Sequence, residues 1–88
     1  MAIRVDHVQI CRRSRVLAHS RFFFYGNEGV EPAHIHVQRD RRLAKFWLGP
    51  VTLARSKGFA AHELMRVEAL VVENRERFLE AWREFFDS

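Results

Sequence analysis

Apolar residues alternate in a period of two along the first half of the chain, a pattern typical of β-strands. The segment 16–25 is the most apolar, because it ends in four consecutive aromatic residues. In a strand, Phe22 and Phe24 would lie on one face and Phe23 and Tyr25 on the other. Both faces of this strand are therefore apolar, and we expect it inside a sheet or beneath a partner.

Other segments of the same half predict further strands. Residues 3–10 are rich in β-branched side chains and predict a strand at the start of the chain. The segments 34–37 and 43–48 predict two more, joined by a polar turn. Residues 51–54 predict a short strand or a turn, because they follow a Gly-Pro pair.

The period of two also assigns side chains to faces. His34 and His36 share one face of their strand, and Lys45 and Trp47 share one face of the next. The intervening apolar residues are candidates for the core: Ile35, Val37, Phe46 and Leu48. If these face the core, the two histidines, the lysine and the tryptophan lie together on the opposite face.

From Ala60 onward, apolar residues recur at steps of three and four, which predicts an amphipathic helix. The stripe contains Leu64, Val67, Val71, Phe78 and Phe85. Asn74 falls on the same stripe. A polar residue there either breaks the helix or specifies a contact, so we expect one long helix or two helices joined at Asn74.

These patterns predict one α+β domain over residues 1–88. A small, mainly antiparallel sheet occupies the N-terminal two thirds, covered by one long or two consecutive C-terminal helices. The length of 88 residues suits a single core, and the 48% hydrophobic content suits a packed protein.

Positive charge is concentrated in the sheet-forming part of the chain. Residues 1–58 carry 11 basic and 4 acidic side chains, whereas 59–88 carry 4 basic and 7 acidic ones. Such an asymmetry suits a surface that binds nucleic acid or an acidic protein.

Cys11 is the only cysteine, so the chain cannot form an internal disulfide, and a reducing compartment is the simpler expectation. The N-terminal residues lack the apolar segment of a signal peptide, and no run approaches the roughly 20 apolar residues of a membrane span. We therefore expect a cytoplasmic protein with no membrane partner.

His34 and His36 permit three interpretations. They could bind a metal, but a third ligand at fixed spacing is missing, so His19, Glu28 or His62 could contribute only through the fold. They could also be structural, forming hydrogen bonds with the preceding turn and with Glu28.

The third interpretation is acid–base catalysis on an RNA phosphodiester. One imidazole would accept the 2′-hydroxyl proton and the other would protonate the leaving oxygen, while Lys45 stabilises the phosphorane charge. Residues two apart on a strand are separated by about 6.6 Å, which suits opposite sides of a phosphate. If the protein is an enzyme, we expect catalysis by His34, His36 and Lys45, without metal or cofactor.

Arg39, Arg41 and Arg42 lie in the turn between the two central strands and are candidates for attracting phosphates. Trp47 could stack on a base of single-stranded RNA if it is exposed.

Five stretches give the chain a resemblance to a known family: RFFFYGNEG, EPAHIHV, AKFWL, GFAAHEL and ENRERFLEAW. Over residues 16–86 the chain resembles a family of small, mostly bacterial domains of unknown function. Residues 1–15 are expected to be an N-terminal extension. Gly26 stands where the family pattern has Ser, and Ala33 where it has a second Pro.

The resemblance implies a function, because similar domains are encoded beside a second small protein in pairs that look like toxin–antitoxin modules. The chain is therefore expected to be the toxin-like component, neutralised by a small antitoxin-like partner, with a homo- or hetero-oligomer as a possible assembly. If it is an enzyme, we expect a ribonuclease. The alternative is a non-catalytic module that binds nucleic acid or a protein.

Overall fold

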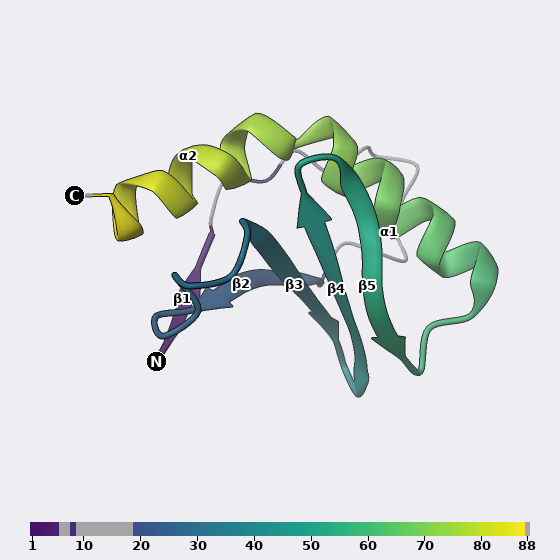
Figure 1. Ribbon diagram of the computed structural model, residues 1–88. Coiled ribbons are helices and arrows are strands. Elements are labelled where there is room, and N and C mark those ends of the chain that lie inside the picture. The colour runs from purple at the N-terminus through teal and green to yellow at the C-terminus, as the bar shows by residue number, and fades with distance from the viewer. Residues whose placement is uncertain (6–7, 9–18, 88) are drawn as a thin grey trace.

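The computed structural model, which describes residues 1–5, 8 and 19–87, contains five strands and two helices (Figure 1). The strands form one antiparallel sheet in chain order, from β1 at one edge to β5 at the other. They are β1 (Ala2–Arg4), β2 (Arg21–Tyr25), β3 (His34–Arg39), β4 (Arg42–Leu48) and β5 (Val51–Lys57). The helices are α1 (Ala61–Glu73) and α2 (Arg75–Phe86). The predicted α+β class is confirmed.

The first two strands are shorter than the sequence predicted. β1 ends at Arg4, although Val5 still donates its backbone N–H to the carbonyl of Phe22 at 2.8 Å. Val8 also lies outside a strand, while its side chain packs against the core. The remaining residues of the predicted strand 3–10, residues 16–18 and most of the predicted N-terminal extension lie outside the described residues.

The two central turns explain why β3, β4 and β5 form a continuous meander. Asp40 and Arg41 connect β3 to β4, and Asp40 has a φ of 54°, which an aspartate tolerates better than most residues. Gly49 and Pro50 connect β4 to β5 through a cis peptide bond. The alternative of a turn at 51–54 is wrong, because these residues continue into the strand β5.

A bulge in β5 changes which side chains share a face. Lys45 of β4 lies opposite Arg55, but its neighbour Phe46 lies opposite Leu53, so Ala54 is the additional residue. Arg55 and Leu53 therefore point to opposite faces although they are two residues apart. The bulge turns Arg55 to the face that carries Lys45.

The helices pack on one face of the sheet and form the core with it. Buried strand residues on this face are Phe22, Phe24, Ile35, Val37, Phe46 and Leu48. The helices contribute Val67, Leu70, Val71, Phe78, Leu79 and Trp82. Phe22 stacks on Phe78 with ring centroids 5.4 Å apart, and Phe24 contacts Trp82 at 5.1 Å. The four core residues predicted from β3 and β4 are confirmed.

Asn74 separates the helices and is itself buried. Its side-chain amide donates to the carbonyl of Leu70 at 2.9 Å, and its own carbonyl accepts the N–H of Phe78. Of the two predicted arrangements, the structure therefore has two helices joined at Asn74. The hydrogen bonds leave this buried amide satisfied at the bend.

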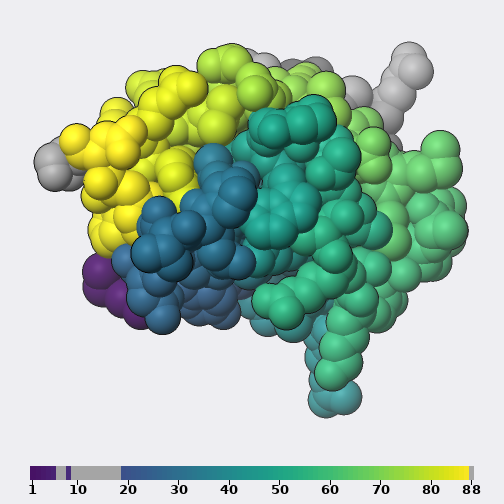
Figure 2. All heavy atoms as spheres, viewed as in Figure 1, coloured from purple at the N-terminus to yellow at the C-terminus, as the bar shows by residue number. Residues whose placement is uncertain are grey.

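The connection between β2 and β3 packs against the end of α2 (Figure 2). A Cβ atom at Gly29 would lie 2.5 Å from Cδ1 of Phe86, so only glycine allows this approach without displacing the ring. This contact fixes the position of the loop that carries Glu28 and Glu31. Among the described helices, none is long and apolar enough to cross a membrane.

The two faces of β2 predict different costs of mutation. Phe24→Ala should lower the free energy of unfolding by about 3–5 kcal/mol, because it leaves a cavity among buried rings. Tyr25→Ala, on the opposite and partly exposed face, should cost about 1 kcal/mol. Urea unfolding of both variants measures the difference, and equal losses would contradict the assignment of faces.

Candidate functional site

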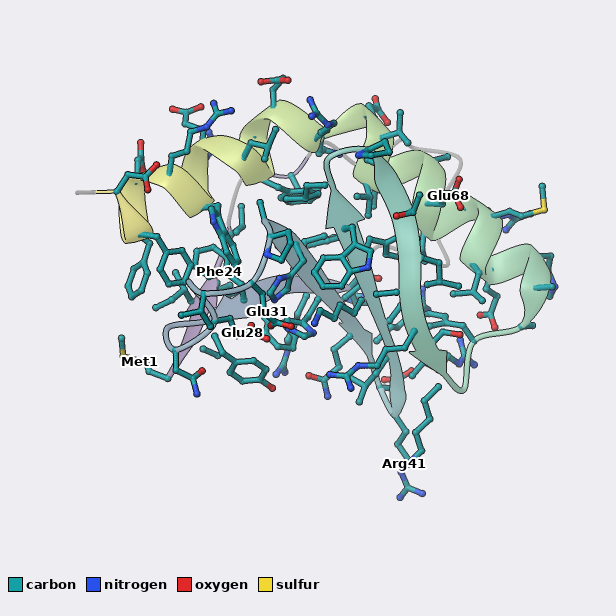
Figure 3. All side chains as sticks on the ribbon, viewed as in Figure 1. Met1, Phe24, Glu28, Glu31, Arg41 and Glu68 are labelled. Atoms are coloured by element: carbon teal, nitrogen blue, oxygen red, sulfur yellow. The ribbon has the colours of Figure 1, made fainter. Side chains whose placement is uncertain are left out.

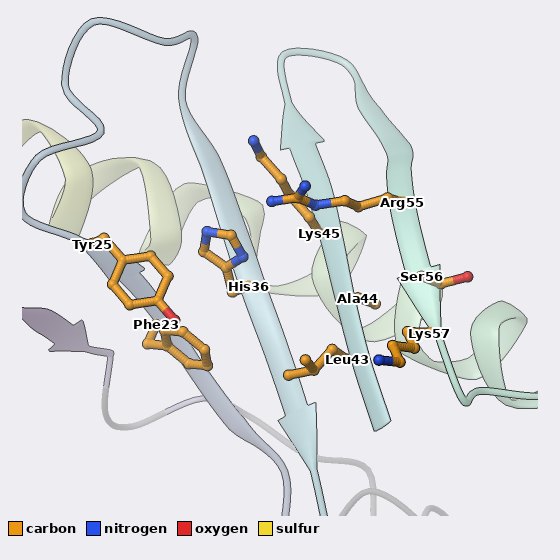
Figure 4. Close-up of a pocket in the computed structure, with 9 residues that line it drawn as sticks. All are labelled: Phe23, Tyr25, His36, Leu43, Ala44, Lys45, Arg55, Ser56 and Lys57. Carbon is orange, nitrogen blue, oxygen red and sulfur yellow. The ribbon is translucent and has the colours of Figure 1, made fainter. Parts of the chain in front are cut away.

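The face of the sheet opposite the helices contains a groove of about 310 Å³ (Figure 4). Phe23 and Tyr25 of β2 lie on one side of it, with His36 of β3 beside them. The basic lining residues come from β4 and β5: Lys45, Arg55 and Lys57. The groove is therefore aromatic on one side and positively charged on the other.

A second hollow of about 240 Å³ shares Phe23 and Tyr25 with the groove. Arg4 of β1 and Arg21 of β2 also line it. We call the combined surface the open face; its residues are Arg4, Arg21, Phe23, Tyr25, His36, Lys45, Arg55 and Lys57. Basic side chains thus flank the two aromatic rings on both sides.

The ring of His36 packs into the aromatic cluster of the open face. It stacks on Phe23 with centroids 5.3 Å apart and meets Tyr25 edge-on at 5.2 Å. Tyr25 is 41% exposed, so one ring of the cluster is accessible to a ligand. The alternation along β2 puts both aromatic residues here, since their neighbours Phe22 and Phe24 fill the core.

Glu28 connects the β2–β3 loop to both strands. Its carboxylate accepts the backbone N–H of Tyr25 at 2.7 Å and lies 3.0 and 3.1 Å from Nε2 of His36. Nε2 of His34 lies 3.1 Å from Oε2 of the same carboxylate. One acidic side chain therefore positions both histidines.

The pKa values of this cluster are shifted. The pKa of His36 lies below its ordinary value, because burial and the charge interactions with His34 and Lys45 together outweigh the hydrogen bond and charge of Glu28, which raise it. The imidazole therefore stays neutral to a lower pH than an ordinary histidine. For Glu28, burial raises the pKa, but the N–H of Tyr25 and the two imidazoles lower it by more, so the net shift is downward. The carboxylate therefore stays ionised at lower pH than an ordinary glutamate.

His34 is completely buried. Its Nδ1 lies 2.9 Å from the carbonyl oxygen of Pro32, and its ring lies between Trp47 and Trp82 with centroids 5.6 and 4.9 Å away. The ring is held by these contacts on three sides. A substrate cannot reach it without a rearrangement of the loop.

Lys45 is only 7% exposed, and its ammonium does not extend freely into water. Nζ donates to Oε1 of Glu31 at 3.2 Å and lies 4.6 Å from the ring centroid of Trp47. Lys45 lies directly opposite His36 in the pairing of β3 and β4. The lysine and this histidine thus share the groove, as the alternation of the two strands predicted.

The structure brings the three proposed catalytic residues into one region but does not give them equal access. His36 and Lys45 line the groove, whereas His34 is fully buried and is not among the lining residues. Sequence reasoning missed Glu31 as the partner of Lys45. Glu31 lies five residues before His36, in the loop that leads into β3, and a carboxylate in such a loop can reach side chains of the adjoining strands. This position was only a weak signal of the pairing.

The three arginines predicted to bind phosphates differ in their contacts and exposure. Arg42 donates to Glu63 of α1 at 2.7 Å and ties the hairpin to the helix, while Arg39 is half-buried. Arg41 projects from the tip of the hairpin (Figure 3). Trp47 is half-buried and lines a separate hollow beside Pro32 and the β4–β5 turn, away from the aromatic cluster.

Glu28, His34 and His36 are the group of described residues whose ligand atoms could hold a metal ion. One ligand atom from each lies within 4.8 Å of the others. Two imidazoles and one carboxylate form a common ligand set for divalent transition metals. Of the three candidates for a third ligand, the loop supplies Glu28, and this group includes neither His19 nor His62.

The fold and this surface define a class: a small α+β protein whose sheet is covered by helices on one face and carries aromatic and basic residues on the other. The chain belongs to the family described as a domain of unknown function, DUF4160, whose model matches residues 20–83. Searches among curated proteins and among solved structures find no match.

The lowered pKa of His36 predicts a loss of stability in acid. The unfolded chain binds the proton more readily than the folded one, so protonation favours unfolding. The contribution of His36 is complete above about pH 6.5 and is lost as the pH falls through the folded pKa. The free energy of unfolding in urea, measured with a chelator present, should therefore fall between pH 7 and pH 5.

His36→Gln should flatten this pH profile, because the glutamine does not titrate. His62→Gln is the matched control, since His62 is exposed, and it should keep the wild-type slope. An unchanged slope in His36→Gln would contradict the assignment.

Proposed function

We propose that this protein binds single-stranded RNA on its open face, as the toxin-like component of a two-protein module. The observation that carries the proposal is the pair Phe23 and Tyr25 on β2, the second strand of the sheet, flanked by basic side chains. Antiparallel sheets that bind single-stranded RNA use exposed aromatic rings to stack bases and nearby cations to attract phosphates.

The dimensions of the open face support a short RNA segment. Adjacent strands are about 4.8 Å apart, so β2 and β5 are separated by about 14 Å. A strand of two or three nucleotides spans such a distance. A base on Tyr25 would place the following phosphates near Arg55 and Lys57, which line the far side of the groove.

The difference in charge between the sheet face and the helix face supports the same proposal. Sheet strands β4 and β5 present Lys45, Arg55 and Lys57 to the groove, while acidic side chains such as Glu68, Glu80 and Glu84 lie exposed on the helices. An RNA phosphate is therefore attracted more strongly to the sheet than to the helices, where exposed arginines such as Arg66 and Arg83 offset the acidic side chains. A small acidic antitoxin-like partner that covers the open face would compete with RNA for the same cations.

RNA cleavage is a second candidate, favoured by one observation: His36 and Lys45 lie opposite each other in register and line the groove together. A neutral His36 could accept the 2′-hydroxyl proton as the 2′-oxygen attacks phosphorus, Lys45 could stabilise the negative charge there, and water would protonate the departing 5′-oxygen. Because His34 is buried, catalysis of this kind would use His36 as the accessible imidazole. His34 then acts by positioning Glu28.

Replacing the exposed aromatic residue tests RNA binding. Tyr25→Ala should weaken binding of a fluorescein-labelled ten-nucleotide oligouridine by about 5- to 150-fold, because one stacked base is lost. Fluorescence anisotropy measures the dissociation constant at several salt concentrations. Circular dichroism of the variant checks that the fold is retained.

Matched arginine variants test the charge of the open face. Arg55→Ala should weaken binding and reduce the slope of log affinity against log salt by about 0.7, the value for one phosphate contact on a single strand. Arg66→Ala removes an exposed arginine from α1 and should leave both quantities unchanged. Equal effects of the two variants would contradict binding at the open face.

Expression in bacteria tests the toxin-like role and the cleavage candidate. The wild-type chain should arrest growth, and Tyr25→Ala should relieve the arrest at an equal soluble level. If cleavage contributes, His36→Ala should abolish RNA cleavage while RNA binding persists within about tenfold. Growth unaffected by the wild-type chain would count against the toxin-like role, but not against RNA binding measured in vitro.

A further inference from the structure

The tautomer of His34 leaves a buried nitrogen in an unusual environment. The carbonyl of Pro32 can only accept a hydrogen bond, so the proton of the neutral ring is on Nδ1, at 2.9 Å from that oxygen. Nε2 then carries a lone pair. This atom is buried and has no hydrogen-bond partner, because the nearby carboxylate of Glu28 is not aligned to form one.

The lone pair instead faces negative charge. Oε2 of Glu28 lies 3.1 Å from Nε2 of His34, and Oε2 of Glu31 lies 3.9 Å from it. A metal ion between these atoms would contact both Nε2 and the carboxylate, and would give the buried nitrogen the partner that it lacks.

His36 completes a set of ligand atoms around the same point. Its Nε2 lies 3.0 Å from Oε1 of Glu28, and the ligand atoms of the three residues lie within 4.8 Å of one another. In a tetrahedral zinc site with bonds of about 2.0–2.1 Å, neighbouring ligand atoms are about 3.3 Å apart. The observed spacing needs only small movements to reach that geometry.

We propose that Glu28, His34 and His36 form a binding site for a divalent transition-metal ion such as Zn²⁺. Two imidazoles and one carboxylate match the protein ligands of many zinc sites that retain an open coordination position. From the sequence we expected no metal, because no third ligand stands at a fixed spacing from the histidines. In the structure Glu28 of the β2–β3 loop supplies that ligand. It does not depend on RNA binding at the open face.

Contacts around the three ligands hold them in position. The hydrogen bond from Nδ1 of His34 to Pro32 is the kind of outer contact that orients metal-binding histidines. The backbone N–H of Tyr25 fixes the carboxylate of Glu28 at 2.7 Å. Glu31 pairs with Lys45, and its Oε2 lies 3.9 Å from Nε2 of His34, close enough to bind the ion or its water.

A metal ion has a route to this site from the loop side. The side chain of Glu28 is 14% exposed and that of Glu31 is 40% exposed, whereas His34 lies behind them. Figure 3 labels both glutamates next to each other at the end of the sheet. The acidic pair would attract a cation before the imidazoles bind it.

Calorimetric titration of the untagged, chelator-treated chain with Zn²⁺ tests the proposal. The wild type should bind one ion per chain, and zinc at about 100 times its dissociation constant should raise the melting temperature by about 10 °C. Glu28→Gln keeps the shape of the side chain but loses the charge, and should weaken binding by about 100-fold. His62→Ala removes an exposed histidine and should bind zinc as the wild type does.

Nuclear magnetic resonance of the histidine rings provides a readout that does not require a variant. Zn²⁺ should move the ring signals of His34 and His36, and should shift the proton of His36 from Nε2 to Nδ1, while His62 is unaffected. Cobalt should give the visible absorption of a tetrahedral site.

Weak zinc binding of equal affinity in the wild type and Glu28→Gln would overturn the proposal. Equal zinc-induced shifts of the ring signals of His62 and His36 would also overturn it. If Glu28→Gln fails to fold, the ring signals of the unmodified chain decide. RNA affinity is measured separately with a chelator present, so loss of the metal site and loss of RNA binding are distinguishable.

Discussion

The carboxylate of Glu28 is the interaction on which the arrangement of the open face depends. It links the end of β2, through the N–H of Tyr25, to both histidines of β3. Without it, the loop would still contact His34 through the carbonyl of Pro32, but it would lose its hydrogen bonds to Tyr25 and His36. The carboxylate itself is satisfied by the N–H of Tyr25 and by Nε2 of His36, whereas Nε2 of the buried His34 has no hydrogen-bond partner.

The groups around Glu28 are also chemically distinct from those in the rest of the groove. His34 and His36 face a carboxylate in a region that excludes most water, whereas Arg55 and Lys57 are exposed cations on β5. The first environment favours a metal ion or a fixed neutral imidazole, and the second favours phosphates. A narrow sheet can therefore present two different binding chemistries, because neighbouring strands carry different loops and edges.

Local patterns were enough to predict the faces of the central strands. The alternation of β3 and β4 correctly placed Ile35 and Phe46 in the core, and the histidines and Lys45 on the other side. Period two is set by backbone geometry, so it needs no knowledge of distant residues. The same pattern could not give exposure, which depends on what lies above each face. Trp82 of α2 and Glu28 of the β2–β3 loop both lie against His34; Trp82 is 48 residues away in sequence, and the path of the loop back over the ring is not set by strand alternation.

Contacts between distant segments account for the other differences. Arg42 pairs with Glu63 across 21 positions of sequence, a contact that the turn alone did not predict. The bulge at Ala54 turns Arg55 toward the groove, although strict alternation would have placed it with Leu53.

By itself, the sequence determined the α+β class, the two faces of the central strands and the concentration of positive charge in the sheet. These follow from local periodicity and composition, which a chain carries whatever its partners are. Only the tertiary structure decided that Glu28 joins the two histidines, that Glu31 neutralises Lys45 and that His34 is closed to solvent. Those facts depend on distances between residues that loops bring together, and the free energy of a buried polar group is set by such neighbours.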